Sequence, residues 1–479
     1  MSPLSRNARR RLALYGGAAF FALAVLGTLW YLRRLERRGG VPVRDLAAEA
    51  KADLDLEPAR LLREYLRIDT TNPPGPTRKA AEFLTRLIDC EGIPWEITGG
   101  DPERPILVAR LTGSTPEGAI VLLSHMDVVP PGDLSKWVKP PFAAEIGTDR
   151  YDRHYLYGRG ALDMKSQTIA YIMALAALRQ AGIVPRRDIV FVAESGEETF
   201  DPWLGMAWLQ AHRPDLLRGV TDVLNEGGVN EVVTTDVERY GIEVMQKAIV
   251  SDFVEARSKE ELEAFRQFLE EKDKALPVRL DPTARAFMRF IAPSRSDVWG
   301  RLMLGADGLV LTPGFLKEVP EVYRSLLKDM IYEDRVEPLP SGGFSMRVVR
   351  TLLPGSSVKT NEDELSGWAR DRGLKVRRHF VSEDSVASPA SGRAFDIVER
   401  VLSLDPVSAP VGIYILNGFY TTSSYVRAHG LRAYGVSPFH VNIVDGARIH
   451  NPNERISLPA FIEGIERMKR IVLELATAP

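Results

Sequence analysis

The sequence predicts an α/β protein in which a mostly parallel sheet is flanked by helices and interrupted by a smaller α+β insert. Three short apolar segments, at 106–111, 119–123 and 188–193, have the length and composition of buried strands. A helical pattern covers 164–181, between the second and the third of these segments. Because strands that alternate with helices form largely parallel sheets, this order indicates an α/β core.

The insert is predicted from a change in the sequence pattern after about residue 231. A charged helical segment at 258–274 is followed by loops, by a strand near 344–350 and by another helix. We expect Thr360 to be the N-cap of that helix, since Asp363 follows three residues later. From 383 onward helices and strands alternate again. The predicted organisation is an N-terminal segment at 1–53, a main domain at 54–232 and 383–479, and an inserted domain at 233–382.

The N-terminal segment contains an uncharged apolar stretch at 12–32, with arginines clustered at 9–11 and 33–38. A helix of about 20 apolar residues is long enough to cross a bilayer, whereas a cleavable signal has a shorter apolar core of roughly 7–15 residues. We therefore predict a single-pass membrane protein, with a buried core helix as the alternative. Both flanks are basic and give little guide to orientation; we favour an extracytoplasmic main domain.

Composition excludes some classes of function. The 62 Lys and Arg residues nearly balance the 64 Asp and Glu residues, and a formal net charge of -2 argues against non-specific nucleic-acid binding. Cys90 is the single cysteine, so the chain has neither an intramolecular disulfide nor a cysteine metal cluster. We expect Cys90 to be a buried apolar thiol. The chain has no G-x-S-x-G motif, which disfavours a serine hydrolase.

Short polar segments carry the residues that are candidates for chemistry. Two residues apart on an extended segment, His125 and Asp127 point the same way, so Asp127 is able to hold the imidazole in one tautomer. Taken singly, each segment has a structural interpretation, such as a helix cap, an acidic turn or a surface histidine. The segments are VLLSHMDVVP, LYGRGALDMKS, FVAESGEETF, LNEGGV and RIHNPNERIS.

Together these segments predict a metal site. Several of them follow apolar strands, and open α/β sheets bind ligands at the carboxyl ends of their strands. Histidines and carboxylates without cysteine suit zinc, manganese or cobalt. In FVAESGEETF, Glu194, Glu197 and Glu198 lie within five positions and repel one another, with no basic residue close in sequence. A bound cation would compensate this acidic cluster.

The motifs resemble those of a known family. In chain order they resemble the dizinc aminoacylase and glutamate-carboxypeptidase-type metallopeptidases, a group that includes dipeptidases and deacylases of N-acyl amino acids. The resemblance spans about 55–232 and 380–475. It implies a zinc-peptidase-like fold with a lid, two divalent ions, most often Zn²⁺ with Co²⁺ or Mn²⁺ as alternatives, and small peptides or N-acyl amino acids as substrates. The matching motifs are IDTTNPPG, HMDVVP, LYGRGALDMK, GEET, NEGG and IHNPNERIS.

The resemblance also implies roles for individual residues. Glu197 is expected to be the general base and Asp127 to orient a histidine ligand, while Glu194 is expected to be structural. Arg350 resembles the arginine that grips the substrate carboxylate, although a surface arginine on a lid strand is an equal alternative. The metal ligands that the resemblance implies are His125 and Glu226 on one ion, Glu198 and His450 on the other, and Asp163 bridging both.

The lid departs from the family pattern. Many relatives carry a lid histidine that stabilises the oxyanion, often across a homodimer interface, but this chain has no histidine between His212 and His379. Residues 250–340 match no family pattern, and the asparagine of the family's N-x-I-P turn is not evident before Arg350. These departures leave open a second hypothesis, in which the chain is a non-catalytic or impaired member that acts as a binding or scaffold protein.

Overall fold

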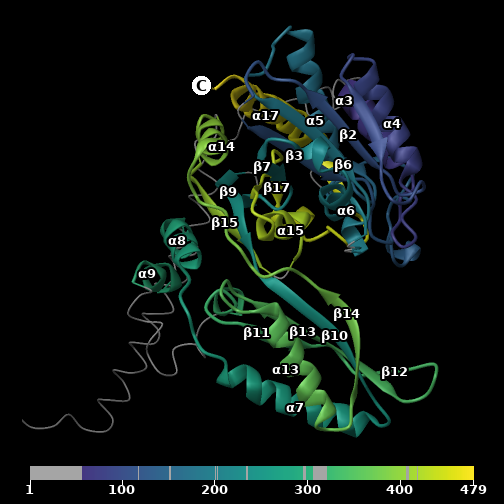
Figure 1. Ribbon diagram of the computed structural model, residues 1–479, viewed down its shortest axis with the longest axis vertical. Helices are drawn as coiled ribbons and strands as arrows, with labels where there is room; N and C mark the ends of the chain where they lie inside the picture. Colours follow the sequence, from purple (N-terminus) through teal and green to yellow (C-terminus); the bar gives the residue numbers. More distant parts are fainter. Residues whose placement is uncertain are drawn as a thin grey trace, which may run out of the picture. The chain divides into compact units, whose positions relative to one another are not determined.

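The largest sheet has ten strands, in the order β1-β2-β6-β3-β7-β16-β9-β8-β17, with β15 paired to β9 (Figure 1). Its central strands β6, β3, β7 and β16 run parallel, as expected for an α/β core. The pairs β1–β2, β2–β6, β16–β9 and β8–β9 are antiparallel, so the sheet is mixed rather than mostly parallel. The predicted strands at 106–111, 119–123 and 188–193 are confirmed as β2, β3 and β6. The bounds are β1 Trp95–Thr98, β2 Ile106–Leu111, β3 Ala119–His125, β6 Asp188–Glu194, β7 Val220–Asn225, β8 Val229–Val233, β9 Asp236–Gln246, β15 Val411–Leu416, β16 Arg432–Gly435 and β17 Val441–Asn442.

This computed structural model describes residues 57–116, 118–149, 153–199, 201, 203–233, 236–294, 298–305, 321–405, 409–417 and 419–478. Helices cover both faces of the large sheet, because its strands are apolar on both sides. On β3, Ile120 and Leu122 pack with α3, α4, α5 and α17, while Val121 and Leu123 pack with α6 and α15. The helices of this part are α3 Glu57–Leu66, α4 Arg78–Asp89, α5 Lys165–Gln180, α6 Gly205–His212, α14 Arg393–Ser403, α15 Thr422–Ala428, α16 Ile443–Gly446 and α17 Leu458–Thr477, with 3-10 turns η1 Leu134–Lys136, η2 Glu197–Thr199 and η3 Pro214–Leu217.

A second sheet of five antiparallel strands, in the order β11-β13-β10-β14 with β12 on β13, lies within the predicted lid. Helices α7 and α13 pack on one face of it (Figure 1), where Leu262, Phe265 and Leu365 meet Val254 and Val348. The bounds are β10 Ala248–Ala256, β11 Met330–Glu333, β12 Glu337–Pro338, β13 Phe344–Leu352, β14 Lys375–Val381, α7 Lys259–Ala275 and α13 Val358–Arg370.

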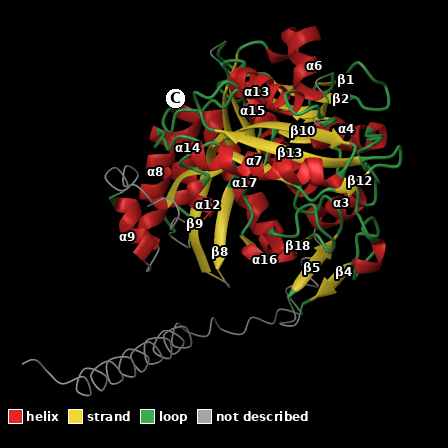
Figure 2. Cartoon of the chain, turned by 90° about the horizontal axis from the view of Figure 1, so that it is seen from below, coloured by secondary structure: helices red, strands yellow, loops and turns green. Residues whose placement is uncertain are grey.

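Other parts of the predicted insert belong with the large sheet. Strand β9 pairs with β15 there, and the ring of Phe287 on α8 meets Tyr414 of β15 edge-on at 5.5 Å. The boundaries predicted at 233 and 382 between the main domain and the insert stay a prediction. A third, three-stranded sheet joins β18, β5 and β4 (Figure 2). The remaining bounds are α8 Pro282–Ile291, η4 Ala292–Ser294, α9 Val298–Leu304, α12 Glu321–Arg324, β4 Ile146–Thr148, β5 His154–Tyr157 and β18 Arg455–Ser457.

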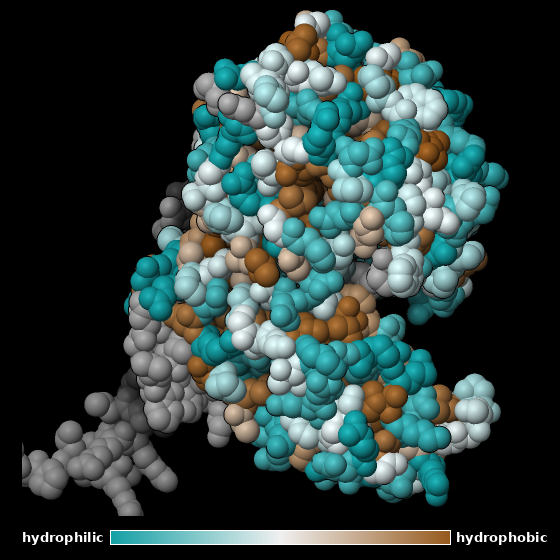
Figure 3. Space-filling view, viewed as in Figure 1, coloured by the Kyte–Doolittle hydropathy of each residue, from teal (hydrophilic) through white to brown (hydrophobic). Residues whose placement is uncertain are grey.

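Two local predictions were wrong. Ser357, not Thr360, is the N-cap of α13, since its side chain accepts a hydrogen bond from the Thr360 backbone N–H and the helix begins one turn earlier. Cys90 is exposed rather than buried, because it follows the last residue of α4. The face shown in Figure 3 is mainly hydrophilic, with apolar patches that are separate from one another, as is usual for a folded protein.

The predicted single-pass membrane localisation is corrected as well. Within the part of the chain that the structure describes, no helix is long and apolar enough to cross a bilayer. The span predicted at 12–32 itself lies outside the described residues.

Candidate metal centre

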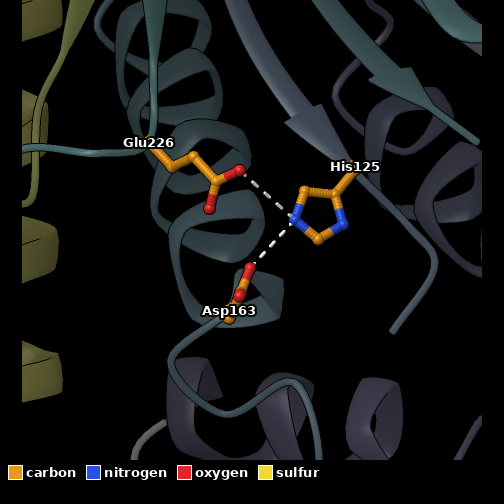
Figure 4. Close-up of side chains that lie close together, drawn as sticks. All are labelled: His125, Asp163 and Glu226. Carbon is orange, nitrogen blue, oxygen red and sulfur yellow. Dashed lines mark hydrogen bonds and ion pairs between the residues drawn. The ribbon is translucent and has the colours of Figure 1, made fainter. Parts of the chain in front are cut away.

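His125 is the last residue of β3, and its two ring nitrogens face different partners. Nδ1 lies 2.9 Å from the backbone oxygen of Asp127. Because a carbonyl oxygen only accepts, Nδ1 carries the proton in the neutral ring. Nε2 then faces two carboxylates, at 3.0 Å from Asp163 Oδ1 and 3.5 Å from Glu226 Oε1 (Figure 4). In the neutral form of the ring, the lone pair of Nε2 therefore points at a cluster of carboxylate oxygens.

A second cluster shares Asp163 with the first. His450 Nε2 lies 3.0 Å from Asp163 Oδ2 and 3.2 Å from Glu198 Oε2. In each cluster the potential ligand atoms all lie within 4.8 Å of one another. The two oxygens of Asp163 therefore face two different sets of ligands, the arrangement expected of a carboxylate that bridges two cations.

The fold brings these residues together from distant parts of the chain. His125, Glu198 and Glu226 follow or end the parallel strands β3, β6 and β7, whose carboxyl ends meet at one edge of the sheet. Asp163 lies just before α5 without capping it, since the N-cap position is Met164 and no side chain caps that helix. The alternative interpretation of Asp163 as a helix cap is therefore wrong.

A buried ion pair that was not predicted holds the segment of Asp163. Glu454 accepts hydrogen bonds from Arg159 Nη1 at 2.7 Å and from the backbone N–H groups of Gly160, Leu162 and Asp163 at 3.1, 2.8 and 3.1 Å. The side chains of Arg159 and Glu454 are 1% and 0% exposed. Both residues lie inside the motifs that carry the family resemblance, and this position was the feature of the sequence that could have pointed to them.

Burial and mutual repulsion perturb the carboxylates of the site. Burial, followed by the charge of Asp163, raises the pKa of both Glu198 and Glu226 to about 7. Burial lowers the pKa of His450, but Asp163 and Glu198 outweigh it and raise that pKa to about 10. Ionised carboxylates crowded in this way favour a positive charge between them. The donor set of oxygen and imidazole nitrogen atoms fits divalent zinc, cobalt or manganese.

Glu197 and Glu194 belong to neither of the two clusters. Glu197 is buried, and its Oε1 has no hydrogen-bond partner among the described residues. Burial raises the pKa of Glu197 well above its usual value; the charge of His125 opposes this shift and that of Glu226 adds to it. Glu194 instead accepts a hydrogen bond from the Met206 N–H at 2.7 Å, at the start of α6. This contact agrees with the structural role expected for Glu194.

Asp127 contacts His125 through its backbone. Its carboxylate Oδ1 is 3.8 Å from His125 Nδ1, farther than the carbonyl at 2.9 Å. Its other oxygen, Oδ2, accepts hydrogen bonds from Asn72 Nδ2 at 2.7 Å and from the Glu198 N–H at 3.1 Å. The carboxylate of Asp127 therefore holds the turn that follows β6, and the carbonyl orients the imidazole.

Arg350 is not brought to the two clusters. It is 2% exposed, and its Nη1 donates to Asn361 O and to Glu364 Oε2, both at 3.1 Å. Its guanidinium also lies over the Trp368 ring, on the side of the lid sheet that α13 covers. The role of Arg350 in substrate binding stays a prediction, as does a dimer through the lid. The five-stranded sheet carries His379 on β14.

Comparisons with known proteins identify the family. The model of peptidase family M20/M25/M40 matches residues 121–474. Aminoacylase-1B of Rattus norvegicus is 26% identical over 431 residues, which cover 88% of this chain and 95% of the relative. An M20 family metallo-carboxypeptidase from Sulfolobus solfataricus has a TM-score of 0.69 at 15% identity, covering 87% of this chain and 98% of its own.

Human carnosine dipeptidase 1 has a TM-score of 0.66 at 15% identity, covering 90% of this chain and 98% of its own. At these identities the two solved structures establish the fold. The family model, which covers most of the chain, establishes the kind of enzyme. This chain belongs to peptidase family M20/M25/M40, and its predicted identity as a metal-dependent hydrolase of amide bonds is confirmed.

Proposed function

We propose that the chain uses two divalent ions, Zn²⁺ in the first place, to hydrolyse the amide bond of small peptides or N-acyl amino acids. These substrates carry a free carboxylate. The observation that carries the proposal is Asp163, whose two oxygens face two separate groups of ligands. The names of the relatives, an aminoacylase and a dipeptidase, support this substrate class.

The protein residues have separable tasks in this reaction. His125 and Glu226 would hold one ion, Glu198 and His450 the other, and Asp163 both. When bound, a pair of such ions polarises the scissile carbonyl and lowers the pKa of the attacking water. Glu197 accepts the proton of that water and passes it to the leaving amine, a transfer that typically contributes about 10²–10⁴ in rate. Burial keeps its carboxylate free of competing solvent.

Adjacent glutamates allow a matched test. Glu197→Gln is expected to keep both ions and to lose about 10²–10⁴ in kcat. Glu198→Gln is expected to lose one ion along with activity. The metal content of each protein is measured by elemental analysis, and hydrolysis is measured on a panel of dipeptides and N-acyl amino acids with added Zn²⁺ or Co²⁺.

The outcomes separate the hypotheses. Full activity of Glu197→Gln contradicts its role as base. Equal metal loss in both variants contradicts the division between base and ligand. A wild-type protein that binds two ions but hydrolyses nothing in the panel favours the non-catalytic binding protein. Arg350→Met tests the substrate carboxylate: a rise in KM supports contact with substrate, and an unchanged KM supports a purely structural arginine.

A further inference from the structure

A short segment near the N-terminal end of the described chain lies alongside the residues that follow β3. The Asn72 N–H donates to Val128 O at 2.8 Å, and the Val128 N–H donates to Thr70 O at 3.2 Å. The hydroxyl of Thr70 donates to Met126 O at 2.8 Å. These bonds pair the IDTTNPPG motif with the HMDVVP motif. The family resemblance implied no role for any residue of the IDTTNPPG motif.

The side chain of Asn72 points from this segment toward the candidate site. Asn72 is 3% exposed. Its Nδ2 donates to Asp127 Oδ2 at 2.7 Å and to Thr199 Oγ1 at 3.0 Å. An ionised carboxylate only accepts hydrogen bonds, so the amide nitrogen, and not the amide oxygen, must face Asp127. Both amide protons are used, and both partners belong to the machinery around the metal ligands.

The two acceptors lie at critical positions. Asp127 supplies the carbonyl that orients His125, and its Oδ2 also accepts from the Glu198 N–H. Thr199 is the last residue of η2, the turn that contains the proposed base and the neighbouring ligand. One amide therefore connects the segment after β3 to the last residue of the turn after β6. A buried amide held by two hydrogen bonds has little rotational freedom, so it transmits its own position to both segments.

We propose that Asn72 is a positioning residue, which sets the distance between the His125 segment and the Glu197–Thr199 turn without touching substrate or metal. The inference rests on the proposed function of that turn. The alternative is a buried asparagine that only stabilises the fold. Partners that orient metal ligands typically contribute about 10–100-fold to metal affinity or activity, whereas a purely stabilising asparagine contributes to neither.

The test compares two buried asparagines. Asn230 is 4% exposed, and its Nδ2 also donates two hydrogen bonds, to Ser437 O at 2.6 Å and to Phe439 O at 2.9 Å. Asn72→Leu is expected to lower kcat and Co²⁺ affinity by about 10–100-fold, with a smaller change in KM. Asn230→Leu is expected to lower the melting temperature and to leave kcat and Co²⁺ affinity unchanged. Equal effects of the two substitutions on kcat and affinity overturn the inference.

Thr199 provides a milder second perturbation in case Asn72→Leu fails to fold. Thr199→Val removes the hydroxyl that Asn72 contacts, and Thr199→Ser keeps it. The inference predicts reduced kcat in the valine variant and recovery in the serine variant. Where Asn72→Leu folds, its combination with Thr199→Val is expected to be less than additive, because both changes break one connection. Wild-type kcat in the valine variant contradicts a connection through the hydroxyl.

The readouts keep the two proposals apart. If the wild type is active and Asn72→Leu matches it, the positioning role is overturned and the hydrolase stands. If the wild type binds Co²⁺ but hydrolyses nothing, the proposed reaction fails, and the Co²⁺ titration decides the role of Asn72. Weaker binding in Asn72→Leu, but not in Asn230→Leu, then supports it, and equal binding overturns it. A wild type that binds no Co²⁺ overturns both.

Discussion

Glu454→Gln is the substitution for which the structure predicts the largest loss of stability near the site. The carboxylate has four donors: the Arg159 guanidinium and the backbone N–H groups of Gly160, Leu162 and Asp163. Glutamine keeps the size of the side chain and one accepting oxygen. Its NH₂ group, however, faces donors in place of an acceptor, so two hydrogen bonds are lost on that side and Arg159 remains charged and buried without its counter-ion.

The expected cost follows from this geometry. Removing one member of a buried ion pair typically costs about 3–5 kcal/mol. Two lost hydrogen bonds that involve a charged group, at about 1.5–3 kcal/mol each, give a similar range. Because the unfolding free energy of a domain is only about 5–15 kcal/mol, the loss is a large fraction of the total. The loop before Asp163 also loses its anchor, so Co²⁺ affinity is expected to fall with stability.

Urea unfolding followed by circular dichroism, together with a Co²⁺ titration, measures both effects. Glu474→Gln is the control, since its pair with Arg400 joins side chains that are 45% and 51% exposed and screened by water. The double variant Arg159→Met/Glu454→Gln is expected to recover part of the stability, because it leaves no unpaired buried charge and keeps an accepting oxygen for two of the backbone N–H groups. If Glu454→Gln is no less stable than Glu474→Gln, the reasoning about the buried pair is refuted.

Three further predictions concern other parts of the chain. Burial lowers the pKa of His440 to about 4. Between pH 6.5 and 5 the unfolded chain therefore binds a proton that the native histidine does not, and the unfolding free energy falls by roughly 1.5 kcal/mol. His440→Gln is expected to reduce this dependence of the unfolding free energy on pH, measured in urea titrations. An unchanged pH dependence contradicts the lowered pKa of His440. A Cβ on Gly464 would lie 2.2 Å from the Phe439 ring, whereas Gly367 on α13 faces open space. Gly464→Ala is therefore expected to lower the unfolding free energy by about 1–3 kcal/mol, and Gly367→Ala to raise it by about 0.5–1 kcal/mol. Equal melting temperatures of the two variants would refute this difference. Removal of divalent ions with a chelator is expected to lower the melting temperature, and Zn²⁺ or Co²⁺ to restore it, since ligands that bind only the native state stabilise it.

Patterns of neighbouring residues were sufficient to predict several of the core elements. The apolar segments became β2, β3 and β6, and the helical pattern at 164–181 became α5, because burial on a strand or helix imposes a period that is visible along a single segment. The same reasoning failed at segment ends. It placed the N-cap of α13 at Thr360 and buried Cys90, since one turn or one residue decides those contacts.

The sequence by itself determined the kind of chemistry: two histidines, several carboxylates and no competing cysteine, in motifs whose order resembles one family. Tertiary structure alone decided which atoms meet. It showed that the Asp127 carbonyl faces His125, that Asn72 joins two loops, and that Glu454 holds the Asp163 segment. Arg350 turned out to be buried between the five-stranded sheet and α13. Such contacts join residues far apart in sequence, so they depend on how whole elements pack, and no local periodicity reports them.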